Sequence, residues 1–224
     1  MFQVNNVSFS YKKAKVLNDI SFEIKQGDCA ALVGANGCGK TTLLSICSGA
    51  RKTKNGEVLF FGKKLPGNTN ERLKLVGYVP QENPLIPDLS VKDNLRLWFA
   101  GNSKEFEKEL ESGFLSALHI DSFINKQVKA LSGGMKKRVS IGLALQNHPS
   151  MLILDEPSAS LDLVCKEEIK SFLTLYLKAG GTILITTHDE DELSLCNRMF
   201  LLNKGSICER EASLRGSELL GLLR

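Results

Sequence analysis

The pattern of apolar and polar positions along this chain predicts a mixed α/β protein. Residues 2–9 and 20–24 alternate between apolar and polar side chains, as strands with one buried face do. Residues 57–62 favour another short strand that ends in a turn. Nearly continuous apolar runs, which are typical of parallel strands buried on both faces, lie at 30–33, 151–154 and 182–187.

The middle of the chain has a helical pattern instead. Three helices are expected there; Ser90 is placed to cap the first, and Gly133-Gly134 opens the last. They should cover residues 91–99, 106–118 and 135–146. The chain enters this block through Pro80-Gln81-Glu82-Asn83-Pro84, and residues 205–224 should add a short strand and a leucine-bearing helix. A helical block therefore interrupts an α/β core.

The strongest chemical signal lies where the apolar run at 30–33 meets a glycine-rich loop. Glycines let a backbone turn tightly and point its N–H groups at an anion, and a following helix adds the positive end of its dipole. In such a loop Lys40 reaches the β- and γ-phosphates, and the Thr41 hydroxyl ligates Mg²⁺. The pattern predicts binding of a nucleoside triphosphate, whereas a simple turn with an incidental Lys-Thr would need neither the strand nor the helix. The loop reads Gly34-Ala35-Asn36-Gly37-Cys38-Gly39-Lys40-Thr41-Thr42.

A second motif places two carboxylates, Asp155 and Glu156, directly after the apolar run at 151–154. Open α/β sheets bind their ligands at the carboxyl ends of the strands. One carboxylate suits Mg²⁺, and the other can polarise an attacking water. Acidic residues are common where loops begin, but the pairing with a phosphate loop favours hydrolysis of the bound nucleotide.

Composition narrows the class of protein. The 224 residues are 42% hydrophobic and 24% charged with a net charge of +4, which is typical of one ordinary globular domain. No signal peptide is expected, and no apolar run approaches the roughly 20 residues that span a bilayer. Six cysteines show no metal-ligand spacing with the three histidines, which favours a reducing, cytosolic compartment. Solvated surface is expected for most of the basic clusters, Lys12-Lys13-Lys15, Lys63-Lys64 and Lys136-Lys137-Arg138.

A third motif, Leu131-Ser132-Gly133-Gly134-Met135, precedes a basic helix. With it, the chain resembles the nucleotide-binding domain of ABC transporters, since the family's motifs occur in order from Tyr11 to His188. Between these ends lie the phosphate loop, Gln81, the Leu131–Met135 motif, Asp155-Glu156 and the turn Ser158-Ala159-Ser160-Leu161-Asp162. The resemblance implies a P-loop NTPase (RecA-like) core with a mixed sheet, an antiparallel β subdomain and an inserted α-helical subdomain. One domain, 1–224, is expected, with its core at 1–82 and 149–224 and its helical part at about 83–148.

The resemblance also implies where ATP and Mg²⁺ bind. Tyr11 would stack on adenine, with Val16 as an added apolar contact, although a surface residue at a strand end is the alternative for Tyr11. The remaining ATP contacts would come from the phosphate loop and Gln81. Mg²⁺ would be held by Thr41, Gln81 and Asp155.

For hydrolysis, the resemblance assigns roles to Glu156, His188 and Lys40. Glu156 would be the general base or would position the water, and Gln81 would sense both Mg²⁺ and that water. His188 would contact the γ-phosphate, although a histidine after a buried strand is usually a packing residue. The two other histidines match no motif, and surface or local capping roles are expected for His119 and His148.

The third motif presents a hydroxyl, bare backbone N–H groups and a helix N-terminus, which together form a second phosphate site. Two such sites separated by a helical block are hard to bring onto one nucleotide, so Ser132, Gly133 and Gly134 are expected to contact ATP held by a second chain. Asp162 would couple the two sites across the dimer. The alternative for Ser132 is a plain helix cap. Met135 stands where the family more often has Gln, and a thioether cannot replace an amide's hydrogen bonds.

These features predict an ATP-binding and ATP-hydrolysing subunit that dimerises around ATP and powers a separate transmembrane transporter subunit. It would be a homodimer or pseudo-dimer when ATP is bound, with no nucleic-acid partner. It would be cytoplasmic and peripheral, on the inner face of the cell membrane through its partner. The alternative is a soluble ABC-type ATPase that drives protein remodelling or cofactor assembly.

Overall fold

The computed structural model describes residues 1–224 except 13, 68, 100 and 224. Its centre is a six-stranded sheet with the order β10-β9-β3-β8-β7-β6. The sheet is mixed, because β10 pairs antiparallel with β9 while the other pairs are parallel. Its strands are β3 (Cys29–Val33), β6 (Val76–Val79), β7 (Met151–Asp155), β8 (Thr182–Thr186), β9 (Arg198–Asn203) and β10 (Ser206–Arg210).

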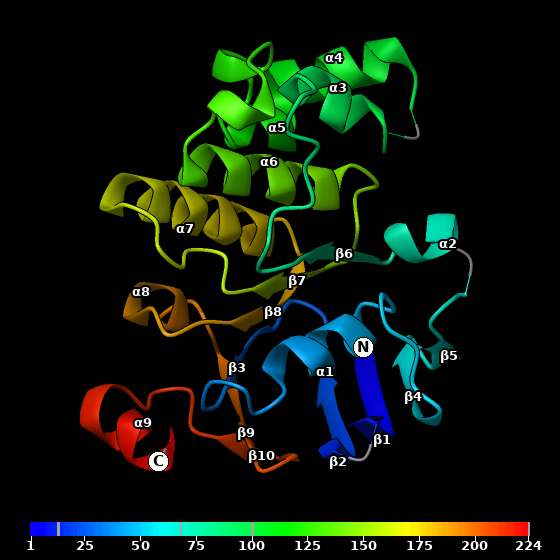
Figure 1. Cartoon of the computed structure of the whole chain (residues 1–224), viewed down its shortest axis with the longest axis vertical. Coiled ribbons are helices and arrows are strands. Elements are labelled where there is room, and N and C mark those ends of the chain that lie inside the picture. The colour runs from blue at the N-terminus through cyan, green and yellow to red at the C-terminus, as the bar shows by residue number, and fades with distance from the viewer. Residues whose placement is uncertain (13, 68, 100, 224) are drawn as a thin grey trace.

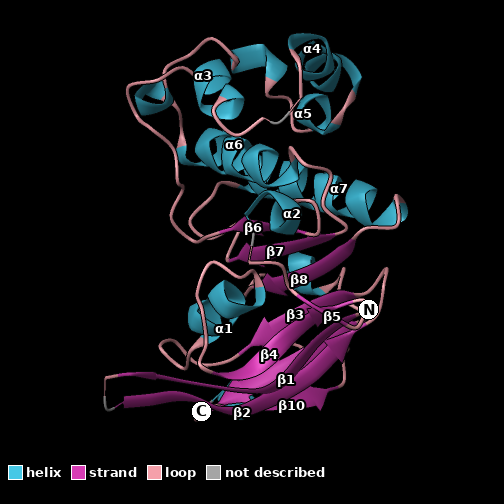
Figure 2. Cartoon of the chain, turned by 90° about the vertical axis from the view of Figure 1, so that its right-hand side faces the viewer, coloured by secondary structure: helices cyan, strands magenta, loops and turns pink. Residues whose placement is uncertain are grey.

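A second, antiparallel sheet has the order β2-β1-β4-β5. Its strands are β1 (Phe2–Tyr11), β2 (Ala14–Ile24), β4 (Asn55–Phe60) and β5 (Lys63–Lys64). Val4 of β1 pairs with Phe22 on one side and Val58 on the other. Figure 2 shows this sheet at the end of the molecule opposite the helical block. The fold expected from the sequence, with a mixed sheet and an antiparallel β part, is confirmed.

Most of the helices gather on one side of the central sheet. Helices α3 to α6 form a block at one end of the molecule, and α7 packs beside α6 next to the central sheet (Figures 1 and 2). This block is α3 (Val91–Arg96), α4 (Ser103–Ser112), α5 (Phe114–Ala117) and α6 (Gly133–Leu145). The other helices are α1 (Lys40–Cys47), α2 (Thr69–Leu73), α7 (Leu163–Lys178), α8 (Glu190–Leu193) and α9 (Gly216–Leu223). No helix in the described part of the chain combines the length and apolar character needed to cross a bilayer.

The central sheet separates two hydrophobic cores. On β3, Cys29, Ala31 and Val33 pack on the side of α6 and α7. Ala30 and Leu32 face the other side, with α1 and the antiparallel sheet. Since side chains alternate along a strand, a strand between two cores must be apolar at every position. This explains the continuous apolar runs in the sequence.

One expectation about the helical block is wrong. Residues 106–118 form two helices, because the backbone is extended at Gly113 and the Glu109 carboxylate accepts a hydrogen bond from the N–H of Phe114 at 3.1 Å. Most of the basic clusters are expected to be solvated; Lys63 and Lys64 are exposed, whereas Lys137 and Arg138 at the start of α6 are buried. Ser90 does cap α3, since its hydroxyl accepts a hydrogen bond from the N–H of Asp93.

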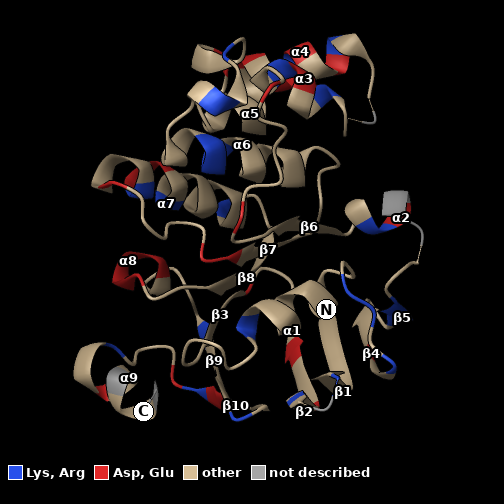
Figure 3. Cartoon of the chain, in the orientation of Figure 1, with Lys and Arg blue, Asp and Glu red and all other residues tan. Residues whose placement is uncertain are grey.

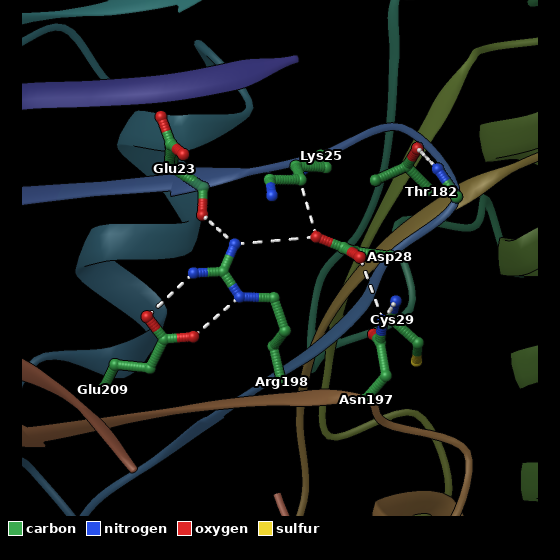
Figure 4. Close-up of polar contacts among 9 residues, drawn as sticks. Glu23, Lys25, Asp28, Cys29, Thr182, Asn197, Arg198 and Glu209 are labelled. Carbon is green, nitrogen blue, oxygen red and sulfur yellow. Dashed lines mark hydrogen bonds and ion pairs between the residues drawn. The ribbon is translucent and has the colours of Figure 1, made fainter. Parts of the chain in front are cut away.

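An arginine at the start of β9 ties the two sheets together (Figure 4). The Arg198 guanidinium donates to both carboxylate oxygens of Glu209 on β10, at 2.7 and 2.8 Å. It also donates to the Glu23 carbonyl of β2 at 2.7 Å and lies 3.5 Å from Asp28. The planar, bidentate contact joins β9 to β10, and the hydrogen bond to Glu23 joins this edge of the central sheet to the antiparallel sheet.

Candidate active site

The glycine-rich loop between β3 and α1 has a backbone that requires its glycines. Gly37 and Gly39 have φ angles of +78° and +111°, a region that other residues rarely enter. A Cβ at Gly34 would collide with the Leu202 carbonyl of β9 and with the sulfur of Cys38. The loop is therefore held tightly curled, with its first residue pressed against the next strand.

Lys40 lies inside this curl. Its side chain is buried, and its Nζ donates hydrogen bonds to the carbonyls of Gly34 at 2.7 Å and Ala35 at 3.2 Å. An arriving phosphate can offer oxygens to the same ammonium and to the loop's N–H groups. The neighbouring Thr41 is exposed, so its hydroxyl is open to a metal ion.

A cavity of about 490 Å³ lies over the loop. It brings both ends of the predicted nucleotide site together: Tyr11 and Val16 at one end, Gln81 and Glu156 at the other. The Tyr11 hydroxyl lies 3.3 Å from that of Thr42, and the Arg51 guanidinium lies 5.1 Å from the Tyr11 ring centre. The wall is formed by Tyr11, Val16, Asn36, Gly37, Gly39, Lys40, Thr41, Thr42, Gln81 and Glu156.

Asp155, at the end of β7, has one carboxylate oxygen without a protein partner. Its Oδ1 accepts a hydrogen bond from the Thr186 hydroxyl at 2.7 Å, whereas its buried Oδ2 has no hydrogen-bond partner in the described residues. A buried oxygen in this state fits a cation ligand. The described residues contain no cluster of three His, Cys, Asp or Glu side chains suited to a metal. A Mg²⁺ ion held by Asp155, Thr41 and Gln81 would therefore need phosphate oxygens or water as further ligands.

Glu156 has an unusual backbone. Its φ is +48°, the left-handed region that costs an ordinary residue roughly 1–2 kcal/mol. Its N–H donates to both the carbonyl and the hydroxyl oxygen of Thr186 on β8, each at 3.0 Å. Strain of this kind gathers at functional sites, where the surrounding structure holds it in place.

Three of the predicted residues meet at the Glu156 carboxylate. Its Oε2 accepts a hydrogen bond from the Gln81 Nε2 at 3.2 Å, and its Oε1 lies 4.0 Å from the His188 Nε2. The three residues follow β6, β7 and β8, which are adjacent parallel strands, so their loops meet at one edge of the sheet. This arrangement can hold and polarise a water beside the phosphates.

The predicted trans-acting residues lie outside this cavity. Ser132 and Gly133 are exposed, and the Ser132 hydroxyl accepts a hydrogen bond from the N–H of Met135 as the cap of α6. A Cβ at Gly134 would collide with Cys165, so this glycine also lets α6 approach α7 closely. Asp162 caps α7, and the N–H of Cys165, 2.9 Å away, holds the pKa of Asp162 below its usual value.

The two histidines outside the motifs both lie on the surface. His119 is exposed, and His148 is exposed with its Nε2 3.5 Å from the Glu109 carboxylate. This agrees with the surface role expected from the sequence.

One buried residue beside the site, Lys137, belongs to no motif that assigns it a role. The Lys137 ammonium on α6 donates to the backbone carbonyls of Pro80 at 3.2 Å and Gln81 at 2.9 Å, and burial lowers its pKa. It therefore holds the segment that carries Gln81 against the helical block. The only sequence signal is spacing, because Lys137 shares a helix face with the buried Gly134 and Ile141.

Comparisons with known proteins agree on one family. The sequence model described as "ABC transporter" matches residues 17–159. The chain is 36% identical over 208 residues to the Nod factor export ATP-binding protein I of Cupriavidus metallidurans, which covers 92% of this chain and 69% of the relative. It is also 36% identical over 215 residues to the spermidine/putrescine import ATP-binding protein PotA of Spiroplasma citri, covering 92% and 60%.

Solved structures give the same answer. A dimeric, post-hydrolysis structure of the ATP-binding cassette MJ0796, bound to ADP and Pi, superimposes with a TM-score of 0.84 at 29% identity. The match covers 96% of this chain and 100% of that one. The structure of cbiO1 from Clostridium perfringens, part of a cbiONQ transporter complex, has a TM-score of 0.79 at 30% identity, with 94% and 88% covered.

Proposed function

The chain belongs to the ABC transporter family and is an ATPase of that family, and from this premise we propose that it powers a separate membrane-spanning transporter subunit. In this proposal two copies, or one copy and a similar chain, close on ATP and reopen after hydrolysis. The core at 1–82 and 149–224 and the helical part at about 83–148 are its working units.

The observation that carries the proposal is the meeting of Gln81, Glu156 and His188 beside Lys40 and the phosphate loop. In the proposed cycle, Lys40 binds the β- and γ-phosphates, and Glu156 polarises the attacking water. Gln81 and His188 orient that water and the γ-phosphate from either side. Mg²⁺, held by Thr41, Gln81 and Asp155, would neutralise charge on the phosphate oxygens.

Dimer closure is supported by what the free chain leaves exposed. Ser132 and Gly133 lie open at the start of α6, away from the chain's own cavity. Beside Asp162, Leu163 and Val164 are 83% and 69% exposed. Large exposed apolar residues next to an anion-binding helix end suit a surface that another chain covers. The relative MJ0796 is itself dimeric.

The membrane partner is supported by a second apolar surface. Leu97 and Trp98 are 58% and 60% exposed at the end of α3. Trp98 lines a cavity of about 250 Å³ together with Tyr78 and Pro84, which lie on either side of Gln81 in the sequence. A segment of the membrane-spanning subunit bound there could act on Gln81. We therefore place the chain on the inner face of the cell membrane, held through that partner.

The alternative, a soluble ATPase that remodels a cytosolic protein, makes a different prediction about fractionation. A transporter subunit should pellet with membranes only when its membrane-spanning partner is co-expressed. Pelleting that does not depend on such a partner, or co-purification with a soluble assembly protein alone, would favour the alternative.

The central test is Glu156→Gln, which keeps the size of the side chain and removes its charge. ATP should still bind while turnover falls by roughly 100-fold or more, and the variant should elute as an ATP-bound dimer. Glu190→Gln, a change to an exposed carboxylate of α8, is the matched control. Turnover in Glu156→Gln equal to the wild type would refute the proposed role.

A further inference from the structure

Helix α8 carries three consecutive acidic residues, visible as a red element in Figure 3. Glu190 and Asp191 are exposed, but Glu192 is only 3% exposed. Buried carboxylates are rare unless they are paired or hydrogen-bonded. Glu192 belongs to none of the sequence motifs, and the mechanism above makes no use of it.

Hydrogen bonds connect Glu192 to both neighbours of His188. The Thr187 hydroxyl donates to Oε2 of Glu192, and the same hydroxyl oxygen accepts from the N–H of Asp189 at 2.9 Å. When Glu192 is ionised its Oε2 can only accept, so the Thr187 hydroxyl proton then points at Glu192. The carboxylate therefore anchors the backbone on both sides of His188.

The same carboxylate lies against the segment that follows Glu156. The hydroxyl of buried Ser158 interacts with Glu192 and favours its charged form. The Oε1 oxygen of Glu192 has no full hydrogen-bond partner in the described part of the chain. One side chain therefore joins the loops after β7 and β8, yet its own hydrogen bonding is incomplete.

The surroundings of Glu192 set its protonation. Burial is the largest influence and raises its pKa to about 7, and the hydroxyls of Thr187 and Ser158 oppose this rise. The charged or titratable groups that face it are Asp189 and Lys166, which pair at 2.7 Å, together with Lys137 of α6, Cys29 of β3 and Cys196. Glu192 can therefore exchange its proton near neutral pH.

We propose that Glu192 is a positioning residue for ATP hydrolysis, whose ionised carboxylate fixes residues 187–189, and with them His188, relative to Glu156. This inference rests on the proposed function. Hydrogen bonds to an ionised carboxylate are shorter and stronger than those to its neutral form. Protonation loosens the segment, and the 4.0 Å approach of His188 to Glu156 is no longer held.

The experiment measures kcat and KM for Mg-ATP between about pH 6 and about pH 8.5. The proteins are the wild type, Glu192→Gln and the exposed control Glu190→Gln. The wild type and the control should gain turnover as pH rises through about 7. Glu192→Gln should lose roughly tenfold in kcat at the high end of the range, with KM little changed, and should lack that pH-dependent rise.

A second pair of variants keeps the test decisive if Glu192→Gln fails to fold. Thr187→Val removes the hydroxyl that links Glu192 to Asp189 and should lower kcat at unchanged KM. Thr187→Ser keeps the hydroxyl and should restore most of the lost turnover. The chain has only three histidines, so the ring signals of His188 can be resolved by NMR and should shift in Thr187→Val but not in Glu190→Gln.

The possible failures are distinguishable. A Glu192→Gln protein with the wild-type pH profile and kcat overturns the positioning role and leaves the proposed function intact. Equal turnover in Thr187→Val and Thr187→Ser overturns it as well. Wild-type turnover in Glu156→Gln would instead refute the proposed function.

Discussion

Glu192 should make the folding stability of this protein fall as pH rises, whereas ATP turnover should increase over the same pH range. In the folded chain its pKa is raised from the usual 4.5 to about 7, mainly by burial. Between these two values the folded state keeps a proton that the unfolded chain has released. The contribution of Glu192 protonation to the free energy of unfolding is therefore fully present below about pH 4.5 and is lost as pH rises through about 7.

The magnitude follows from the same two values. One pH unit of pKa difference corresponds to about 1.4 kcal/mol, so the difference from 4.5 to about 7 gives roughly 3 kcal/mol. A side chain only 3% exposed has little solvent screening to reduce this figure. Glutamine does not titrate. The free energy of unfolding of Glu192→Gln should therefore rise relative to that of the wild type by roughly 3 kcal/mol from low to high pH.

Urea unfolding at several values from about pH 5 to about pH 8 measures this directly. The wild type and Glu192→Gln should diverge as pH rises, whereas the wild type and Glu190→Gln should run parallel. Subtracting the wild-type free energy of unfolding from that of each variant at the same pH cancels the effect of every titrating group that the two proteins share. Parallel curves for the wild type and Glu192→Gln would refute the account of the buried carboxylate.

Three further predictions test other parts of the site. Lys40→Ala should abolish tight ATP binding in its own chain, whereas Ser132→Ala should spare it and impair dimer closure; equal loss in isolated monomers would rule out a two-chain site. Lys137→Met should lower the free energy of unfolding in urea by about 2 kcal/mol and lower turnover, since the carbonyls of Pro80 and Gln81 lose a charged donor; unchanged stability would contradict this. Glu156→Gly should be more stable than Glu156→Ala by about 1 kcal/mol, because glycine relieves the positive φ; the reverse order would show that no strain is stored.

Much of the fold is visible in the sequence where local pattern and tertiary environment agree. The apolar runs at 30–33 and 151–154 are strands because each lies between two cores and has no polar face. The phosphate loop is recognisable because its glycines are required by backbone geometry at Gly37 and Gly39. The convergence of Gln81, Glu156 and His188 follows once their strands are placed side by side.

The remaining features depend on partners that are distant in the sequence. Lys137 and Glu192 are of residue types that usually lie on the surface. Their charged groups can be buried because the Gln81 carbonyl and the Thr187 hydroxyl, which are distant or out of pattern in the sequence, form hydrogen bonds with them. Gly113 lies in an amphipathic pattern that continues through it, so the break between α4 and α5 appears only with the capping contact from Glu109. Strand β6 contains four residues, one of them glycine, which is too short for a periodic pattern.

The position of β3 in the sheet has a consequence for how the protein is made. Its neighbours, β8 and β9, begin at Thr182 and Arg198, so the ribosome finishes them long after the phosphate loop. At a translation rate of about 5–20 residues per second, roughly 10–30 s pass between synthesis of the loop and synthesis of the strands that pair with β3. ATP therefore cannot assist folding of the early part of the nascent chain. Nucleotide binding arises only after β8 and β9 have been made, and a chain arrested before Thr182 should have no ATP site to stabilise it.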